Sequence, residues 1–437
     1  MISMPPPAFP SILADSSRRV SSRIFKQGWL AALCAALLFT ISGQAQQSLQ
    51  VLHHHVRPEV SNGQAALVGP VSATQKMQLS ILLPLRNQAG LTSLLGQIYD
   101  PSNPNYRHFL SVDQFTEQFA PTAEDYQAIV SFAQANGFTV TGTPANRLIV
   151  PIRGSVAQVE KAFNLRMNNY QHPTEKRTFF SPDREPSLNL SVQVTHVAGL
   201  NNYSIPRPMV TKAATAQGPV KSAVIGSGPG GSYLGSDMRA AYYTGNLPAG
   251  QTPLDGTGQT VGLVEFDGYN ITDVVSSFDG TATSNADGSN YVLAYTPAAG
   301  GTTYSIPVNN VLLDGTTGAP VTGTDAEETL DIVQAIGMAP GLSQVRVYIG
   351  NSDVDVLNAV ATENLAQQLS ISWTWEPDDP STDDAFFLEF AAQGQSAFAA
   401  SGDYGAFDPL LDNFYPAEDA WVSIRTQCIS CSFNSLN

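Results

Sequence analysis

Two acidic side chains four residues apart form the pattern with the clearest chemical potential. Glu327 and Asp331 lie in segment 325–337, which has apolar residues at helical spacing and a capping residue, Thr324 or Asp325, at its start. Residues four apart share one helix face, and this segment holds no Lys or Arg. If both carboxyl groups are buried together, one should keep its proton, which suits acid–base chemistry at low pH. Acids at a helix start are also favoured by the helix dipole, so a purely structural explanation stays open.

A third acid, Asp403, follows the apolar segment 397–400 and stands between Gly402 and Gly405. The apolar segment predicts a strand, and the two glycines allow a sharp turn at its carboxyl end. A protonated Asp in such a turn could donate a hydrogen bond to an oxyanion that develops during acyl transfer. An Asp that closes an ordinary strand-end turn is the alternative.

The imidazole groups are confined to the first part of the chain. All six His lie at or before position 196, so the later part cannot build a Ser-His-Asp, Cys-His or His-zinc site from its own residues. The triplet 53–55 is expected to be solvated surface, with a metal site as the alternative. Cys428 and Cys431 form a Cys-x-x-Cys without a further Cys or a nearby His, so no metal site is expected there.

Length and composition set the frame for these residues. A chain of 437 residues is long enough for two domains, and 43% hydrophobic with 13% charged residues is typical of globular proteins. The formal charge of -16 argues against nucleic acid and anionic membrane surfaces as partners.

Residues 1–45 predict a signal peptide that directs secretion or export to the periplasm. Four basic residues precede the apolar run 29–41, and small residues follow it at 43–45. The apolar run is shorter than the roughly 20 residues that a membrane-spanning helix needs, although a permanent anchor is the alternative. No membrane contact is expected once the segment is removed, and the export route stays open.

The pattern of segments 50–203 indicates an α+β domain. Helices are predicted at 121–137 and 155–163, and strands at 138–140 and 147–152. Residues 204–231 are rich in Pro, Ala, Ser and Gly and predict a linker.

Beyond the linker, apolar strands alternate with helical segments, which predicts a parallel sheet with helices on its faces. The strands are expected at 259–265, 345–349, 369–373 and 397–400, and a site in such a sheet lies at the carboxyl ends of its strands. From Pro206 onward, six basic residues stand against 26 acidic ones, while the preceding domain is nearly balanced. This asymmetry could help the two domains associate, or the acidic face could simply be solvated.

Together, several of these segments resemble the sedolisin family of serine-carboxyl peptidases and its pro-kumamolisin activation domain. The segments that carry the resemblance are Tyr106 to Leu110, Gln114-Phe115, Phe119 to Pro121, Val156 to Phe163, Asp255 to Val261, Glu327 to Asp331, Ser370 to Trp373 and Ala400 to Asp403. The resemblance implies an α/β fold, an incomplete subtilisin-like parallel sheet with helices on both faces, preceded by an α+β ferredoxin-like prodomain. Residues 50–203 would be the prodomain, 204–231 the linker and 232–422 part of the catalytic domain.

The resemblance also implies an activity and roles for single residues. Family members cleave proteins in acid through a Ser acyl-enzyme, and the prodomain assists folding, inhibits its own catalytic domain and is removed by self-cleavage. Glu327 would be the general base, Asp331 its supporting carboxyl group and Asp403 the acid beside the oxyanion. Glu265 and Trp373 would extend the carboxyl network.

The sequence departs from the family pattern at the nucleophile. The family's Gly-Thr-Ser segment, with a Pro shortly after it, should follow the Asp403 motif, and no such segment occurs. Ser396 lies in a superficially similar context but precedes Asp403, so it is not expected to serve. After residues 415–422 the tail 423–437 matches nothing in the pattern, which suggests a frameshift or an early stop. The family's calcium site would lie in the missing part, so no cofactor is expected.

Two alternatives to a peptidase precursor remain. The first is a non-catalytic product, either an inactive fragment or a binding protein that uses the prodomain fold. The second, a carbohydrate-acting enzyme with two carboxyl groups, fits less well because such acids usually come from separate segments and not from adjacent turns of one helix.

Overall fold

The computed structural model describes residues 49–209, 226–227, 233–242, 254–278, 280–285, 288–296, 303–321, 325–375 and 381–400. These residues all belong to one compact unit, Leu49–Asn437. We call residues 49–209 the leading region and the described residues from 226 to 400 the later region. The predicted signal peptide, Asp403, the tail 423–437 and most of the predicted linker lie outside the described residues.

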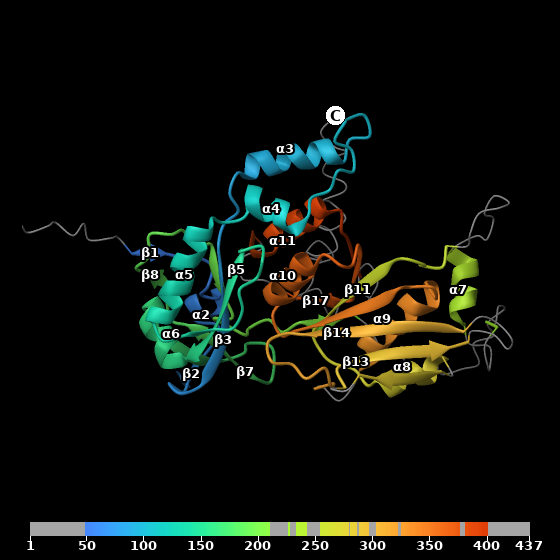
Figure 1. Cartoon of the computed structure of the whole chain (residues 1–437). Helices are drawn as coiled ribbons and strands as arrows, with labels where there is room; N and C mark the ends of the chain where they lie inside the picture. The colour runs from blue at the N-terminus through green and yellow to red at the C-terminus, as the bar shows by residue number, and fades with distance from the viewer. Residues whose placement is uncertain are drawn as a thin grey trace, which may run out of the picture. The chain divides into compact units, whose positions relative to one another are not determined.

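The leading region mixes short strands with helices (Figure 1). Its elements are, in chain order, β1 (Gln50–Val51), α2 (Pro58–Ser61), β2 (Leu67–Pro70), β3 (Lys76–Leu82), α3 (Gln88–Ile98), α4 (Val112–Phe119), α5 (Ala123–Ala135), β4 (Thr139–Val140), β5 (Ile149–Ser155), α6 (Val156–Phe163), β6 (Met167–Gln171), β7 (Thr178–Pro182), β8 (Ser187–Leu188), β9 (His196–Ala198) and β10 (Arg207–Pro208).

Three sheets organise the leading region. A four-stranded antiparallel sheet has the order β4-β5-β3-β9, a three-stranded sheet has the order β2-β6-β7, and β1 pairs with β8. Helices α5 and α6 pack on the four-stranded sheet, where Ile129 and Phe163 meet Ile81 and Val150 in a fully buried core. Both helices that the sequence predicts are therefore confirmed.

Local side-chain hydrogen bonds explain where these helices begin. Ser155 accepts a hydrogen bond from the backbone N–H of Gln158, whose side chain accepts one from the N–H of Ser155 in return. Thr122 accepts the N–H of Asp125 at the start of α5. These bonds satisfy backbone donors that a first helical turn leaves without intrahelical partners, so they fix the helix boundaries locally.

The leading region also overturns one expectation. His53 and His54 are exposed, as expected for a solvated triplet, but His55 is fully buried. Its ring stacks on that of His196, and its Nε2 accepts the backbone N–H of Val197, 142 positions later in the chain. The prediction of a solvated triplet is thus wrong for His55, because a residue far away in the sequence covers it.

The later region is an α/β structure, which confirms the broad fold class. Its elements are α7 (Gly235–Tyr242), β11 (Thr260–Glu265), α8 (Ile271–Phe278), β12 (Thr281–Ser284), β13 (Asn290–Tyr295), β14 (Tyr304–Leu312), α9 (Ala326–Met338), β15 (Gln344–Ile349), α10 (Asp353–Glu363), β16 (Gln368–Ile371), β17 (Trp373–Thr374), α11 (Ser381–Gln393) and β18 (Ser396–Ala399).

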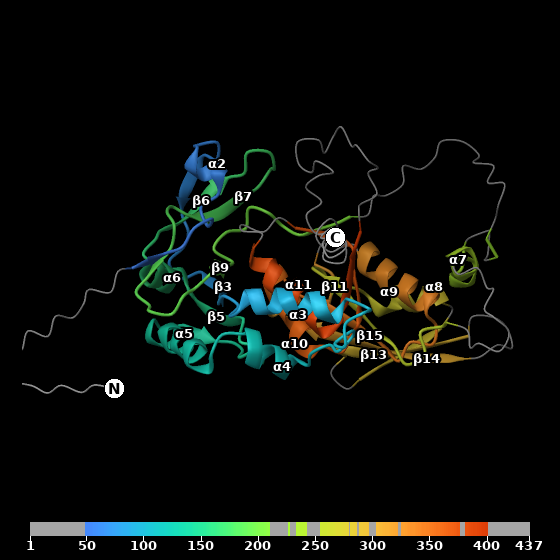
Figure 2. The same cartoon turned by 90° about the horizontal axis from the view of Figure 1, so that it is seen from above.

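One seven-stranded sheet with the order β12-β13-β14-β15-β11-β16-β18 forms the centre of this region. The strands from β14 to β18 are parallel, whereas β12, β13 and β14 form an antiparallel extension that the sequence analysis did not predict. Consecutive residues of β11 face opposite sides: Leu263 packs in the core under α8 and α9, and Val264 packs in the core under α10 and α11. Helices therefore cover both faces of the sheet (Figure 2).

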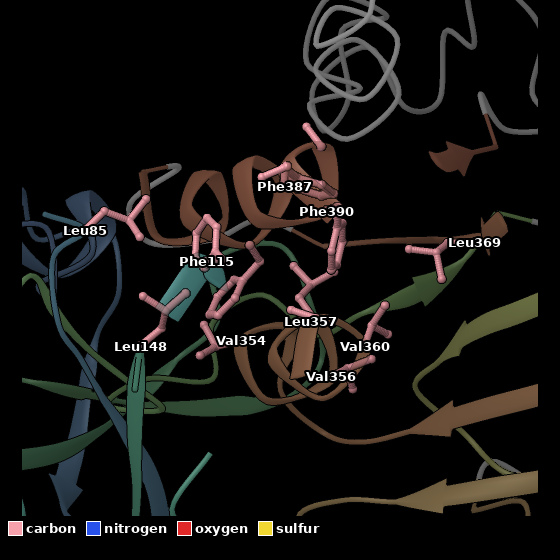
Figure 3. Close-up of a cluster of buried hydrophobic side chains, with 14 of the residues drawn as sticks. Leu85, Phe115, Leu148, Val354, Val356, Leu357, Val360, Leu369, Phe387 and Phe390 are labelled. Atoms are coloured by element: carbon pink, nitrogen blue, oxygen red, sulfur yellow. The ribbon is translucent and has the colours of Figure 1, made fainter. Parts of the chain in front are cut away.

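A hydrophobic core shared by both regions joins them. Figure 3 shows Phe115 of α4 and Leu148 of the leading region beside Leu357 of α10 and Phe390 of α11. All four side chains are at most 2% exposed, and each contributes roughly 1.5–3 kcal/mol through burial. The two regions therefore associate mainly through apolar surface.

Two buried hydrogen bonds accompany this shared core. Ser80 of β3 donates to Oδ1 of Asp355 at 2.6 Å, and Asn146 donates to Oε2 of Glu389 at 2.8 Å. Both acceptors belong to helices of the later region. The leading region thus covers two carboxyl groups and offers each of them a neutral donor.

Candidate active site

Helix α9 carries the acidic pair that the sequence analysis singled out. Glu327 is 6% exposed and Glu328 2% exposed, while Asp331, one turn later, is half-buried. Asp325 occupies the N-cap position, but its side chain does not cap the helix and instead accepts hydrogen bonds from the backbone and side chain of Asn270. The expected capping role of Asp325 is therefore wrong, because a loop after β11 takes its carboxylate.

A second carboxyl group meets Asp331 from the sheet. Glu265 is the last residue of β11 and is fully buried, and its Oε2 accepts the indole N–H of Trp373 at 2.7 Å. The carboxyl groups of Glu265 and Asp331 influence each other's ionisation, and one oxygen of each, Oε1 of Glu265 and Oδ2 of Asp331, is buried without a hydrogen-bond donor among the described residues. Oδ1 of Asp331 accepts the hydroxyl of Ser372 at 2.8 Å. These four side chains form one network at the carboxyl ends of β11 and β16, the edge where parallel sheets place their sites.

Burial is the main cause of the unusual acidity in this network. It raises the pKa of Glu265 well above its usual range, and the negative charge of Asp331 raises it further. Burial also raises the pKa of Asp331 to about 6, although the hydrogen bond from Ser372 opposes this shift. Burial and the neighbouring carboxylate therefore favour the protonated form of Glu265, and the two groups titrate as a pair.

Further acids surround the network. Burial raises the pKa of Glu328 to about 8, with added repulsion from Asp267, Asp325 and Glu327. Asp267, two residues after β11, accepts the backbone N–H groups of Gly268 and Val321 at 2.7 Å each. Within the described stretches, no group of three or more His, Cys, Asp or Glu side chains has an arrangement that could hold a metal ion. The raised pKa values of Glu265, Glu328 and Asp331 suit this cluster to holding and moving protons.

The structure brings together most of the residues expected from the sequence. Glu327 and Asp331 occupy the first two turns of α9, and Glu265 and Trp373 are in direct contact. Asp403 lies outside the described residues. The catalytic roles of all five stay predictions.

Ser396 lies at the amino ends of the parallel strands, opposite the end that carries this network. It is the first residue of β18 and is in register with Gln368, which pairs with Val261 near the start of β11. Glu265 lies four residues further along β11, or roughly 13 Å away at the rise of a strand. That Ser396 is not the nucleophile stays a prediction.

Sequence reasoning missed Ser372, Glu328 and Asp267. Ser372 directly precedes Trp373 at the end of a predicted strand, so its place at the sheet's carboxyl edge was a usable signal. Glu328 adjoins Glu327, but a helix pattern alone does not show that both neighbours are buried. Asp267 follows the strand by two residues and gave no spacing signal.

The end of the leading region reaches this site. Arg207 and Pro208 of β10 pair antiparallel with Thr374 and Trp373 of β17. The backbone N–H of Met209 donates to the carbonyl of Ser372 at 2.8 Å. Part of the predicted linker is therefore an extended strand beside the Glu265–Asp331 pair.

Comparison with known proteins now adds to this geometry. Residues 63–203 match the model of the pro-kumamolisin activation domain. The chain is 26% identical to kumamolisin of Bacillus sp. (strain MN-32) over 397 residues, which cover 86% of this chain and 66% of that protein. It is also 26% identical to sedolisin of Pseudomonas sp. (strain 101) over 368 residues, which cover 80% of this chain and 58% of that protein.

A third relative, xanthomonalisin of Xanthomonas sp. (strain T-22), is 26% identical over 79% of this chain and 42% of its own length. The chain thus spans less than two thirds of these curated relatives. Because the alignments cover 79% to 86% of the chain, the similarity extends beyond the activation domain into the later region. In the described part of the chain, no helix is long and apolar enough to cross a membrane.

Proposed function

We propose that this chain is a secreted, self-inhibited precursor of a sedolisin-type serine-carboxyl peptidase that acts on proteins at acidic pH. Residues 50–203 are the prodomain, 204–231 the linker and 232–422 part of the catalytic domain. The observation that carries this proposal is the buried carboxyl network in which Trp373 donates to Glu265 and Ser372 donates to Asp331 at the carboxyl ends of the parallel strands. The similarity to kumamolisin and sedolisin supports it.

The chemistry follows from a carboxyl-based proton relay. Glu327 acts as the general base that takes the proton of a Ser hydroxyl, Asp331 orients and stabilises it, and Asp403 donates a hydrogen bond to the oxyanion. A carboxylate base stays ionised at a pH at which an imidazole is already protonated, so this arrangement fits acid conditions. Glu265, which is held by the indole of Trp373, fixes the position of Asp331.

The fold proposed for each part draws support from strand order. In the leading region the order β9-β3-β5-β4, with one or more helices between β3 and β4 and between β5 and β9, supports a ferredoxin-like prodomain. In the later region the parallel order β14-β15-β11-β16-β18 supports a subtilisin-like sheet. Both assignments rest on topology together with the sequence resemblance.

Self-inhibition follows from the way the leading region ends. Extended peptides commonly bind to proteins by adding a strand to an exposed sheet segment. The segment 207–209 adds such a strand to β17, directly beside Trp373, and so occupies the place that a substrate backbone would take. The shared core around Phe115 and Phe390 holds the prodomain on its own catalytic domain.

The remaining assignments rest on the sequence. Residues 1–45 direct the chain to the periplasm or the outside, protein or peptide substrates are the partners, and nucleic acid is not. No cofactor is expected in these residues, since the family's calcium site would belong to a later segment.

These 437 residues should not cleave peptide bonds at a useful rate by themselves. No Gly-Thr-Ser segment follows the Asp403 motif, and Ser396 lies at the amino ends of the parallel strands, whereas the carboxyl network lies at their carboxyl ends. Loss of a nucleophile typically lowers the rate about a million-fold.

The test has two arms. Sequencing of the gene past codon 437 in all reading frames should reveal a Gly-Thr-Ser segment followed by a Pro. The purified chain should show no cleavage of a protein substrate at pH 3 to 5. Robust cleavage that disappears in Glu327→Ala would show that a nucleophile is present in these residues, and cleavage that survives this substitution would contradict the proposed base.

A further inference from the structure

Two buried imidazole rings lie face to face in the leading region. His55 precedes α2 and is fully buried, and His196 opens β9 and is 3% exposed. Their ring centroids are 4.0 Å apart, and the ring planes differ by 14°. We call these two residues the His stack.

The hydrogen bonds around the stack suit two neutral rings. Nε2 of His55 accepts the backbone N–H of Val197 at 3.1 Å, so the proton of His55 is on Nδ1, which faces Oε2 of Glu185 at 3.3 Å. Glu185 also accepts the backbone N–H groups of His55 and Val56. Nδ1 of His196 is buried and has no hydrogen-bond partner among the described residues.

The surroundings oppose a positive charge on His196. Burial, followed by the nearby rings of His55 and His54, lowers the pKa of His196 well below its usual range. Glu185 is the acid at the stack, and it lies on the side of His55. Its carboxylate is already used by His55 and Val56, so His196 has no counter-ion of its own there.

The stack sits where the leading region holds its last strands. His196 pairs with Leu82 of β3, and Ala198 pairs with Ser80, whose hydroxyl donates to Asp355 of the later region. The chain then continues from β9 to β10, which pairs with β17 at the candidate site. His55 connects the segment 49–57 to β9, because its Nε2 accepts the backbone N–H of Val197.

We propose that the His stack is an acid-sensitive latch of the leading region. Protonation of His196 releases the segment 49–57 from β9 and loosens the strand from which the inhibitory segment 207–209 departs. The latch is inferred from the geometry of the His stack alone, whereas its role in relieving inhibition rests on the proposed function.

The sign and size of the effect follow from proton linkage. A His with a lowered pKa contributes stability above its ordinary value of 6.5 and loses it as the pH falls toward its value in the folded protein. Each proton taken up on opening shifts the opening equilibrium about tenfold per pH unit. Between pH 6.5 and 4.5, opening of this segment should therefore increase up to about a hundredfold.

Hydrogen exchange measured by mass spectrometry on the whole chain tests the latch. After correction for the intrinsic pH dependence of exchange, peptides that cover 49–57 and 187–200 should lose up to about a hundredfold of their protection between pH 6.5 and 4.5. His196→Phe keeps an aromatic ring in the stack and should remove most of this loss. His53→Phe, at an exposed position two residues before His55, is the matched control and should leave the loss unchanged.

Two results would overturn the latch. One is protection in the wild-type peptides that does not change with pH, and the other is an equal loss in His196→Phe. If that variant does not fold, the wild-type chain with 13C-labelled His provides the test by NMR, with His196 assigned through its contact with His55. A His196 ring that titrates near pH 6.5 would then contradict the proposal. Neither measurement depends on peptidase activity, so the latch and the proposed function can fail separately.

Discussion

The leading region and the later region both bury an ionisable pair, but of opposite kinds. In the leading region the pair is two stacked imidazoles, His55 and His196, and burial lowers the pKa of His196. In the later region it is Glu265 and Asp331, which approach neutrality when they gain protons. One member of each pair lies at a strand end, His196 at the start of β9 and Glu265 at the end of β11, and each pair is held by partners from distant parts of the sequence.

This difference shows how one chain can respond to acid in two directions. A buried group favours its neutral form, so acid stabilises the carboxyl-rich region and destabilises the imidazole-rich one. The contact between the regions also buries carboxyl groups, because the leading region covers Asp355 and Glu389. Burial raises the pKa of Asp355 well above its usual range, and that of Glu389 to about 8.

The largest effect is expected for Glu389→Gln, which removes a buried acid from the contact. Since its pKa is raised, Glu389 contributes stability that is fully present below about 4.5 and is lost as the pH rises toward 8. At about 1.4 kcal/mol per pH unit, keeping the group neutral costs about 3 kcal/mol at pH 7. The variant should therefore unfold in more urea than the wild type at pH 7 and at a similar concentration at pH 4.5.

Glu363→Gln is the matched control, because Glu363 lies on α10 and pairs with the guanidinium of Arg346 at 2.6 Å. An acid with a cationic partner should gain nothing from neutralisation, so this variant should not be more stable at pH 7. Equal stability gains in both variants would contradict the comparison between the regions.

A smaller effect is expected for Trp373→Phe, which removes the indole donor to Glu265. A buried carboxyl oxygen without its donor costs about 1–3 kcal/mol, which urea unfolding at pH 5 would measure. Because the Trp373 hydrogen bond lowers the pKa of Glu265, its loss should raise this pKa further. The infrared band of protonated carboxyl groups should then persist to a higher pH.

Trp375→Phe controls for the change in ring size. The indole of Trp375 is equally buried and donates to Asp383 at 3.0 Å, away from Glu265. It should destabilise the chain without shifting the titration of the Glu265–Asp331 pair. If the titration of the pair shifts equally in both variants, the proposed role of the Trp373 hydrogen bond is wrong.

The smallest effect is expected for Ser372→Ala. The Ser372 hydroxyl lowers the pKa of Asp331, so its removal should raise this pKa above about 6. The loss of one hydrogen bond to a half-buried carboxylate costs about 1 kcal/mol at pH 7. The same infrared titration measures it, with Ser370→Ala, two residues earlier on the strand, as the control. An unchanged titration in Ser372→Ala would show that Glu265 alone orients Asp331.

Much of the local structure could be predicted because neighbouring residues decide it. The capping pair Ser155 and Gln158 sets the start of α6, and helical spacing places Glu327 and Asp331 one turn apart on α9. The apolar run before Glu265 predicted the buried strand β11. The antiparallel strands β12 and β13 were missed, since short polar segments such as Thr281–Ser284 carry no clear period.

The sequence by itself determined the set of chemical groups: imidazoles only in the leading region, an acid-rich later region, and carboxyl groups at helix and strand ends where a site could form. Only the tertiary structure decided which groups meet. Ser372 reaches Asp331 across 41 positions, Trp373 reaches Glu265 across 108, and Val197 reaches His55 across 142. The physical reason is that burial and pairing set the charge of a titratable group, and both depend on residues that only the folded chain brings together.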